Sequence, residues 1–160
     1  MIKRILFLFF LIFLFSCSEI ELVIKESDST NKLKNKTSVF VEGKKNQILS
    51  QELYLLLGND KKGDFVLVSN FSEKKENRLV KKNQVAEKVD YELTINYDLF
   101  YKNRYCKIYN KKIISKFSFV PKSFGYNFAT DRSLEKLYKT NIRENIRDFI
   151  SSIPDGTNCQ

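Results

Sequence analysis

The sequence predicts a two-layer α+β domain in which amphipathic helices cover one face of a β-sheet. Residues 89–99 alternate between apolar and polar side chains, which is typical of a strand with one buried and one solvated face. Residues 46–57 and 130–153 instead place apolar side chains at helical spacing along one side. Because each element has a single apolar face, the two layers bury these faces against one another.

The N-terminus has the order of an export signal. Lys3 and Arg4 precede an apolar run over residues 5–15, which is shorter than the ~20 residues needed to span a bilayer. A small residue, Ser16, and then Cys17 follow. This order resembles the lipobox of bacterial lipoproteins, in which the cysteine is acylated and the chain is cut before it.

We therefore expect residues 1–16 to be a signal peptide and Cys17 to carry the lipid anchor. An ordinary secretory signal, or an uncleaved anchor, is the alternative. Ser18 stands where an aspartate would be the usual inner-membrane retention signal, so by the same resemblance the expected location is the periplasmic face of the outer membrane.

The remaining composition fits one basic domain. The net charge of +9 becomes +7 once Lys3 and Arg4 are removed, and such a charge favours phosphorylated glycolipid or anionic lipid as partners. Export argues against nucleic acid. We expect a flexible polar tether over residues 17–38, a domain over 39–153 and a polar tail over 154–160.

The first half of the domain reads as strand, helix and strand. The sequence predicts a short strand at 39–41, a helix at 46–57 that stops at Gly58, and a strand at 64–72. Residues 73–88 are strongly polar and are expected to form a connection, with Leu79 and Val80 as a possible strand extension.

The second half reads as a long hairpin and a helix. After the strand at 89–99, a turn is expected at 110–112 and a return strand at 113–120, ended by Pro121. Thr130 or Asp131 is expected to cap a helix that runs to Ile153. Its predicted apolar stripe consists of Leu134, Tyr138, Ile142, Ile146, Phe149, Ile150 and Ile153.

The chain offers little catalytic chemistry. It contains no histidine, no paired CxxC cysteines, no glycine-rich phosphate loop and no recognisable nucleophile with its base. We expect no enzyme activity, no metal and no cofactor. Cys106 and Cys159 could pair in an oxidising compartment, but their separation of 53 residues does not set their distance in space, and two unpaired thiols are the expectation.

Two stretches could bind a partner. The basic stretch of the 73–88 connection could hold phosphate through charge-assisted hydrogen bonds, or could be a solvated loop; its cations are Lys74, Lys75, Arg78, Lys81 and Lys82. The aromatic and basic run at 101–109 could dock on a protein or glycolipid, or could form an ordinary hairpin.

The order of elements resembles the LptE family of lipopolysaccharide-assembly lipoproteins, in its alphaproteobacterial form. The resemblance lies in Cys17 behind its signal, the strand at 86–100, and the run at 118–150 with its Phe-Gly-Tyr-Asn loop and long helix. It implies two helices on one face of a four-stranded, mostly antiparallel sheet. It also implies a non-catalytic plug and assembly partner of the LptD β-barrel that binds lipopolysaccharide.

The resemblance does not identify the lipopolysaccharide contacts. Charge and loop placement alone select Arg78, Lys81, Lys82, Arg104 and Lys107 as candidates. Two other functions remain open: a lipoprotein accessory subunit of an ABC-type export system, and a periplasmic surface protein with a structural role.

Overall fold

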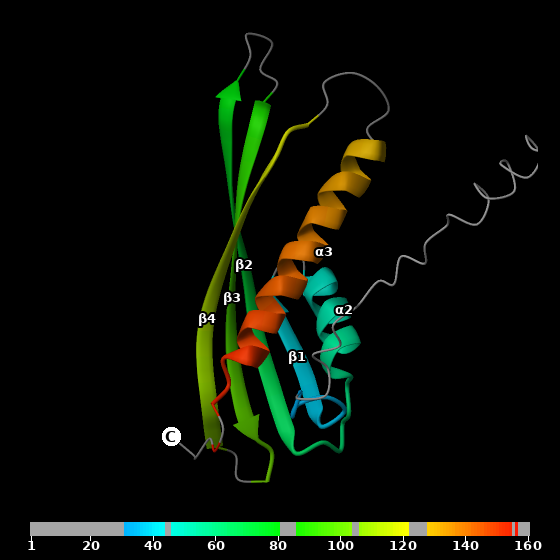
Figure 1. The fold of residues 1–160 in the computed structure, drawn as a ribbon, viewed down its shortest axis with the longest axis vertical. Helices are drawn as coiled ribbons and strands as arrows, with labels where there is room; N and C mark the ends of the chain where they lie inside the picture. Colours follow the sequence, from blue (N-terminus) through cyan, green and yellow to red (C-terminus); the bar gives the residue numbers. More distant parts are fainter. Residues whose placement is uncertain are drawn as a thin grey trace, which may run out of the picture. The chain divides into compact units, whose positions relative to one another are not determined.

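The computed structural model describes residues 31–43, 46–80, 86–103, 106–121, 128–154 and 156, all within a compact unit that begins at Asn31. Its elements follow one another along the chain as shown in Figure 1. They are β1 (Thr37–Gly43), α2 (Asn46–Leu57), β2 (Phe65–Val80), β3 (Ala86–Tyr101), β4 (Cys106–Phe119) and α3 (Phe128–Ser151).

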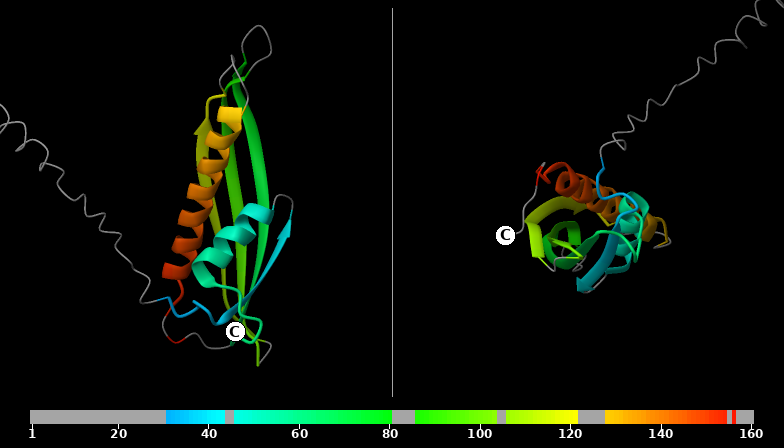
Figure 2. Two further views of the ribbon diagram at one scale, coloured as in Figure 1. Left: turned by 90° about the vertical axis from the view of Figure 1, so that its right-hand side faces the viewer. Right: turned by 90° about the horizontal axis from the view of Figure 1, so that it is seen from below.

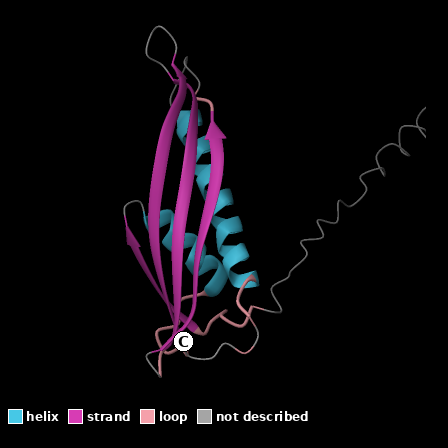
Figure 3. Cartoon of the chain, turned by 90° about the vertical axis from the view of Figure 1, so that its left-hand side faces the viewer, coloured by secondary structure: helices cyan, strands magenta, loops and turns pink. Residues whose placement is uncertain are grey.

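The four strands form one mixed sheet in the order β1-β2-β3-β4. β1 runs parallel to β2, and the β2–β3 and β3–β4 pairs are antiparallel. Both helices lie on one face of this sheet (Figure 2), and the opposite face carries no described element (Figure 3). The predicted two-layer α+β fold, with a mostly antiparallel sheet and one solvated face, is therefore confirmed.

β3 supplies the centre of the core. Its alternate side chains Leu93, Ile95, Tyr97 and Leu99 are fully buried against the helices, whereas the residues between them lie on the open face. β3 lies between two neighbouring strands and under the helical layer. The alternation that predicted this strand therefore corresponds to one face buried by the helices and one open face.

The helices follow the predicted spacing. α2 has the expected bounds, buries Leu49, Leu53 and Leu57, and ends at Gly58, whose φ of 75° favours glycine. α3 begins at Phe128, so Asp131 lies in its first turn and the predicted capping position was wrong. A carboxylate in the first turn still complements the helix dipole.

The region expected to be a polar connection is largely strand. β2 continues to Val80, and it pairs with β3 through Lys74 opposite Glu92 and Arg78 opposite Lys88. The alternation that predicts a strand is missing here because residues 72–78 extend past α2 and are mostly exposed on both faces. Cross-strand charge pairs, such as Arg78 Nε to Asp90 Oδ2 at 2.7 Å, take the place of apolar packing.

The predicted turn at residues 110–112 was also wrong, because these residues lie inside β4. Asn110 pairs opposite Asp98, and the turn of this hairpin comes earlier, after Tyr101. A register shift at Leu99 and Phe100 leaves Ile108 buried on the bulged strand. An aromatic-rich run without glycine gave no signal for either event.

Two further findings revise the sequence analysis. Cys106 is disulfide-bonded, so the expectation of an unpaired thiol at this position was wrong; Cys159 lies outside the described residues. Leu33, inside the stretch assigned to a tether, is 3% exposed and belongs to the core, and its carbonyl accepts a hydrogen bond from Thr37 Oγ1 at 2.8 Å.

Candidate functional site: a free strand edge beside an apolar pocket

The short strand β1 and the short helix α2 end before their longer neighbours β2 and α3. We call this offset in the sheet and its helical layer the step. β1 has 7 residues and β2 has 16, while α2 has 12 and α3 has 24. At ~1.5 Å per residue, α3 is therefore longer than α2 by about 18 Å. Figure 1 shows β2 and α3 continuing past the ends of β1 and α2. The step exposes one edge of β2 and part of the helix-facing surface.

The exposed edge is backbone that a further strand could pair with. β1 pairs with residues 65–71 of β2 and ends at Gly43, where a Cβ would come within 2.3 Å of the Phe71 carbonyl oxygen. Beyond that point, no strand in the described part of the chain pairs with residues 72–78 on the side that β1 occupies. We call residues 72–78 the free edge of β2.

An apolar pocket of about 250 Å³ lies at the same step. It forms where α2 begins and its cover of the sheet stops. Five apolar or aromatic side chains line it: Ile48, Phe71, Leu134, Tyr138 and Ile142. Two carboxylate side chains, Asp131 and Glu135 of α3, complete the lining and are exposed. This cavity, which we call the helix pocket, thus has an apolar floor and an acidic rim.

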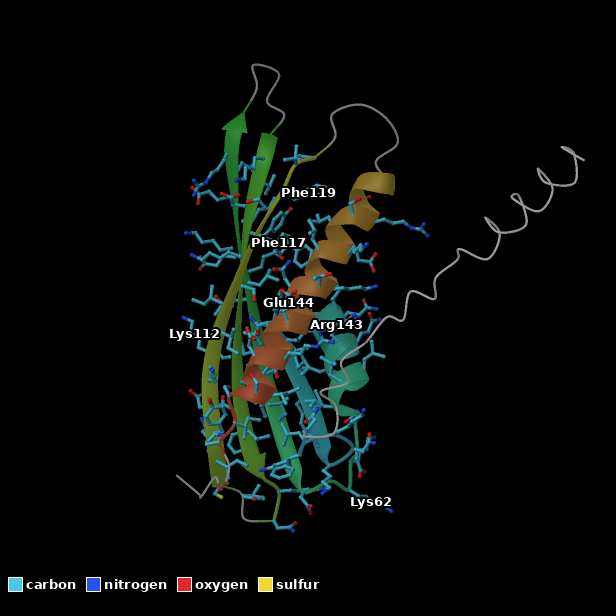
Figure 4. The ribbon with its side chains drawn as sticks, viewed as in Figure 1. Lys62, Lys112, Phe117, Phe119, Arg143 and Glu144 are labelled. Carbon is cyan, nitrogen blue, oxygen red and sulfur yellow. The ribbon has the colours of Figure 1, made fainter. Side chains whose placement is uncertain are left out.

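Aromatic packing and one short hydrogen bond hold Tyr138 in the wall of the helix pocket. The Tyr138 ring meets Tyr91 and Phe117 edge-on, with centroids 5.5 and 5.2 Å apart. Its hydroxyl donates to Glu73 Oε2 at 2.6 Å, which ties α3 to the free edge. Burial, and then the carboxylate of Glu73, raise the pKa of Tyr138, so this hydroxyl stays protonated as a donor at neutral pH. Figure 4 shows Phe117 and Phe119 pointing from β4 toward α3.

The open face of the sheet carries a ladder of opposite charges. The central strand presents Asp90, Glu92 and Asp98. Its neighbours supply the cations: Arg78 reaches Asp90, Lys116 reaches Glu92 at 2.9 Å, and Lys107 reaches Asp98 at 2.7 Å.

These contacts lower the pKa of all three carboxyls. The Ser118 hydroxyl donates to Asp90 at 2.6 Å and is the main cause there. The hydrogen bond from Lys116 is the main cause at Glu92. At Asp98, desolvation opposes ionisation, but hydrogen bonds from Lys107 and Asn110 outweigh it. At neutral pH these three carboxyls are therefore ionised, and each is paired with a cation from a neighbouring strand.

The structure separates two of the residues predicted to contact lipopolysaccharide. Arg78 pairs opposite Lys88, near the start of β3, and Lys107 pairs opposite Phe100, near its end. At ~3.4 Å per residue, these positions are about 40 Å apart along the strand. The side chains are 59% and 42% exposed, and both already contact a carboxylate. Arg78 and Lys107 thus cannot form one compact phosphate site.

The other predicted site residues cannot be placed. Lys81, Lys82, Arg104 and the expected lipidation site Cys17 lie outside the described residues. Lys74 and Lys75, predicted in a basic loop, lie on β2; the Lys75 ammonium sits 5.6 Å from the centroid of the Tyr91 ring. In the 101–109 run, Tyr101 packs against Phe65 with ring centroids 5.1 Å apart, as in an ordinary hairpin.

Within the described residues, there is no group of three or more side chains suited to a metal ion. Neither helix in this part of the chain has the length and apolar character to cross a membrane.

Sequence reasoning missed the free edge and the helix pocket. Ile48, Leu134 and Ile142 were predicted only as part of apolar helix faces and Asp131 only as a cap, and Phe71 was not singled out. The one usable signal was the unequal length of the two predicted helices. It could not be interpreted without the strand order, which shows that the short helix and the short strand lie at the same side.

Comparison with known proteins establishes the fold but no family. No protein-family model matches the sequence, and no curated protein matches it. A candidate lipoprotein from Caulobacter crescentus is 12% identical with a TM-score of 0.56, over 74% of this chain and 88% of its own. A minor lipoprotein from Acinetobacter baumannii is 16% identical with a TM-score of 0.50, over 76% and 92%.

Rare lipoprotein B from Shewanella oneidensis is 13% identical with a TM-score of 0.48, over 72% and 89%. We base the shared fold on the Caulobacter and Acinetobacter structures, whose TM-scores are higher. The chain therefore has the fold of two proteins described as lipoproteins.

Proposed function

We propose that the chain is a lipid-anchored outer-membrane protein of lipopolysaccharide assembly, which acts without catalysis as a plug and assembly partner of an LptD-type β-barrel. Three observations support this proposal. The N-terminus has a lipobox-like order ending at Cys17. The fold is shared with bacterial lipoproteins. The described residues form an unpaired stretch of strand edge in β2 and a neighbouring apolar pocket.

The free edge of β2 beside the helix pocket is the observation that carries the partner proposal. An exposed strand edge pairs readily with another extended segment, which gains main-chain hydrogen bonds from the edge and specificity from pockets for alternate side chains. Here a segment paired with residues 72–78 would continue the line of β1. Its helix-facing side chains would lie over Phe71 and Leu134, and a basic residue would meet the acidic rim.

A β-barrel protein is the partner class that we propose for this step. Such proteins are rich in extended segments, and their loops and lumens are polar. The exposed backbone, the apolar floor and the carboxylates at the rim fit an extended segment that alternates apolar and basic side chains.

For lipopolysaccharide we propose two separate contact regions. One includes Arg78 and the other includes Lys107; the candidates Lys81, Lys82 and Arg104 lie outside the described residues. Because Arg78 and Lys107 now pair with Asp90 and Asp98, a phosphate group would have to exchange with those carboxylates.

The anchor can be tested by replacing Cys17 with serine. We expect Cys17→Ser to release the protein from membranes to the soluble periplasmic fraction, because each buried methylene of the missing acyl chains contributes about 0.8 kcal/mol to attachment. Cell fractionation with the unchanged protein as control measures this. A serine variant that is still processed and membrane-bound would refute the lipid anchor.

The partner can be tested by crosslinking the tagged protein in intact cells, solubilising it in detergent and identifying the captured proteins by mass. Recovery of a large outer-membrane β-barrel would support the proposal. Recovery of inner-membrane transporter subunits instead would favour the accessory-subunit function, and recovery of neither would refute the barrel partnership.

A further inference from the structure

Lysine side chains gather at the end of the domain where the described chain begins. Three chain segments meet at this end: the entry turn at 31–36, the α2–β2 connection at 58–64, and the turn after β3 at 102–103. Together they contain six lysines and two aspartates. The lysines are Lys32, Lys34, Lys36, Lys61, Lys62 and Lys102. We call this group the lysine end.

Hydrogen bonds hold the three segments against one another. The amide of Phe65 donates to the Lys36 carbonyl at 3.0 Å, and the amide of Lys102 donates to the Asp64 carbonyl at 2.9 Å. The Lys102 ammonium also donates to the Lys61 carbonyl. Gly63 packs so closely that a Cβ would come within 2.2 Å of the Lys36 backbone. The lysine end is thus assembled by the fold rather than by one charged loop.

The positive charge at this end faces solvent. All of its lysines are exposed except Lys102, which is partly buried. Of the two acids, Asp60 uses Oδ1 to accept the Lys62 amide at 2.8 Å. Figure 4 shows Lys62 at this extremity of the domain, pointing outward.

We infer that the lysine end docks the domain on an anionic lipid surface. The inference rests on the proposed anchor at Cys17, which precedes Asn31 by only 14 residues. A chain of that length reaches at most about 50 Å even when fully extended. The proposed anchor would therefore keep the membrane within that reach of Asn31, and clustered lysines are attracted to anionic head groups over about one Debye length.

The inference can be tested on the full chain as purified from its own cells and mixed with vesicles of phosphatidylcholine, with or without phosphatidylglycerol. Amine-reactive labelling, followed by mass spectrometry, measures the accessibility of each lysine. We expect labelling of Lys61 and Lys62 to fall by about threefold or more on anionic vesicles and to recover in high salt. Lys116 and Lys139, on the open face and on α3, serve as internal controls and should not change.

A charge-reversed variant tests whether the lysine end acts as one surface. With Lys61→Glu and Lys62→Glu together, the protection of Lys36 on anionic vesicles should disappear. Both side chains are exposed, and the Lys61 carbonyl that accepts from Lys102 is retained, so a thermal melt should match that of the unchanged protein.

Co-sedimentation separates the anchor from the lysine end. One outcome is protein that sediments with both vesicle types and in which Lys61 and Lys62 are labelled to the same extent on each type. Such protein retains its anchor and overturns our inference. Protein that sediments only with anionic vesicles supports the lysine end and contradicts the lipid anchor. Protein that sediments with neither overturns both.

Discussion

Arg143 of α3 donates a hydrogen bond from Nε to Oε2 of Glu52 of α2 over 2.9 Å. The Glu52 side chain is 3% exposed, whereas that of Arg143 is 44% exposed. Figure 4 shows Arg143 reaching from α3 toward α2. This pair joins the two helices, and Arg143 is the charged partner of the buried Glu52 carboxylate.

Replacing Arg143 with methionine should therefore destabilise the domain. The change keeps the aliphatic stem and leaves the Glu52 carboxylate buried without its cation, which we expect to lower the free energy of unfolding by about 2 kcal/mol. Urea unfolding measures this loss. Arg147→Met, at an exposed position one turn along α3, is the matched control and should change stability little. Equal losses in the two variants would contradict a specific role for the Arg143–Glu52 pair.

Tyr97→Phe tests the polar network within the core. The Tyr97 hydroxyl donates to Asn145 Oδ1 at 2.9 Å, and Asn145 Nδ2 donates to Ser115 Oγ at 2.8 Å, so the three residues join β3, α3 and β4. Removing the hydroxyl leaves a buried acceptor without this donor and should cost about 1–2 kcal/mol in the free energy of unfolding. Tyr54→Phe, at a position 43% exposed, is the control. A neutral result at Tyr97 would show that the core does not depend on this bond.

The charge ladder predicts a loss of stability in acid. Asp90, Glu92 and Asp98 have lowered pKa values in the folded protein, so each contributes stability above its unfolded pKa, and that stability is lost as the pH falls through the folded values. We expect the free energy of unfolding to be flat from about pH 8 to 5 and to fall below about pH 4. Asp98→Asn should make this decline shallower. An unchanged slope would mean that the ladder does not contribute.

Reversing the acidic rim should weaken partner binding without unfolding the protein. Asp131→Lys and Glu135→Lys together place positive charge where we expect a basic residue of the partner, so affinity for the proposed β-barrel partner should fall by about tenfold. Surface plasmon resonance measures the affinity, and a thermal melt checks the fold. Glu144→Lys, on the exposed side of α3, is the control (Figure 4). A binding loss of the same size at Glu144 would point to a general charge effect.

The sequence predicted the layers of the fold because they depend on periodicity. Any topology that buries one face of each element requires these patterns, whatever the strand order. Examples are the alternation around Leu93 and Ile95 and the helical spacing of α2. The length of β2 and the position of the β3–β4 turn could not be predicted. They depend on cross-strand pairs, such as Lys74 opposite Glu92, that join residues far apart in the chain.

The candidate site was hidden for the same reason. The free edge is defined by where β1 ends relative to β2, and the helix pocket by where α2 begins relative to Leu134. Both features depend on where one element ends or begins relative to another, and these elements become neighbours only once the strand order is known. Charge and loop placement selected Arg78 and Lys107, but they could not reveal that these residues lie opposite positions near the two ends of β3.

The most direct test of the central claim is amide hydrogen exchange on the protein alone and in complex with the β-barrel protein that we propose as its partner. If an extended segment pairs with the free edge of β2, then outward-facing amides within residues 72–78 gain hydrogen bonds and should exchange at least about tenfold more slowly in the complex. If exchange at residues 72–78 is unchanged while other surfaces become protected, the free edge is not the docking site and the account is wrong.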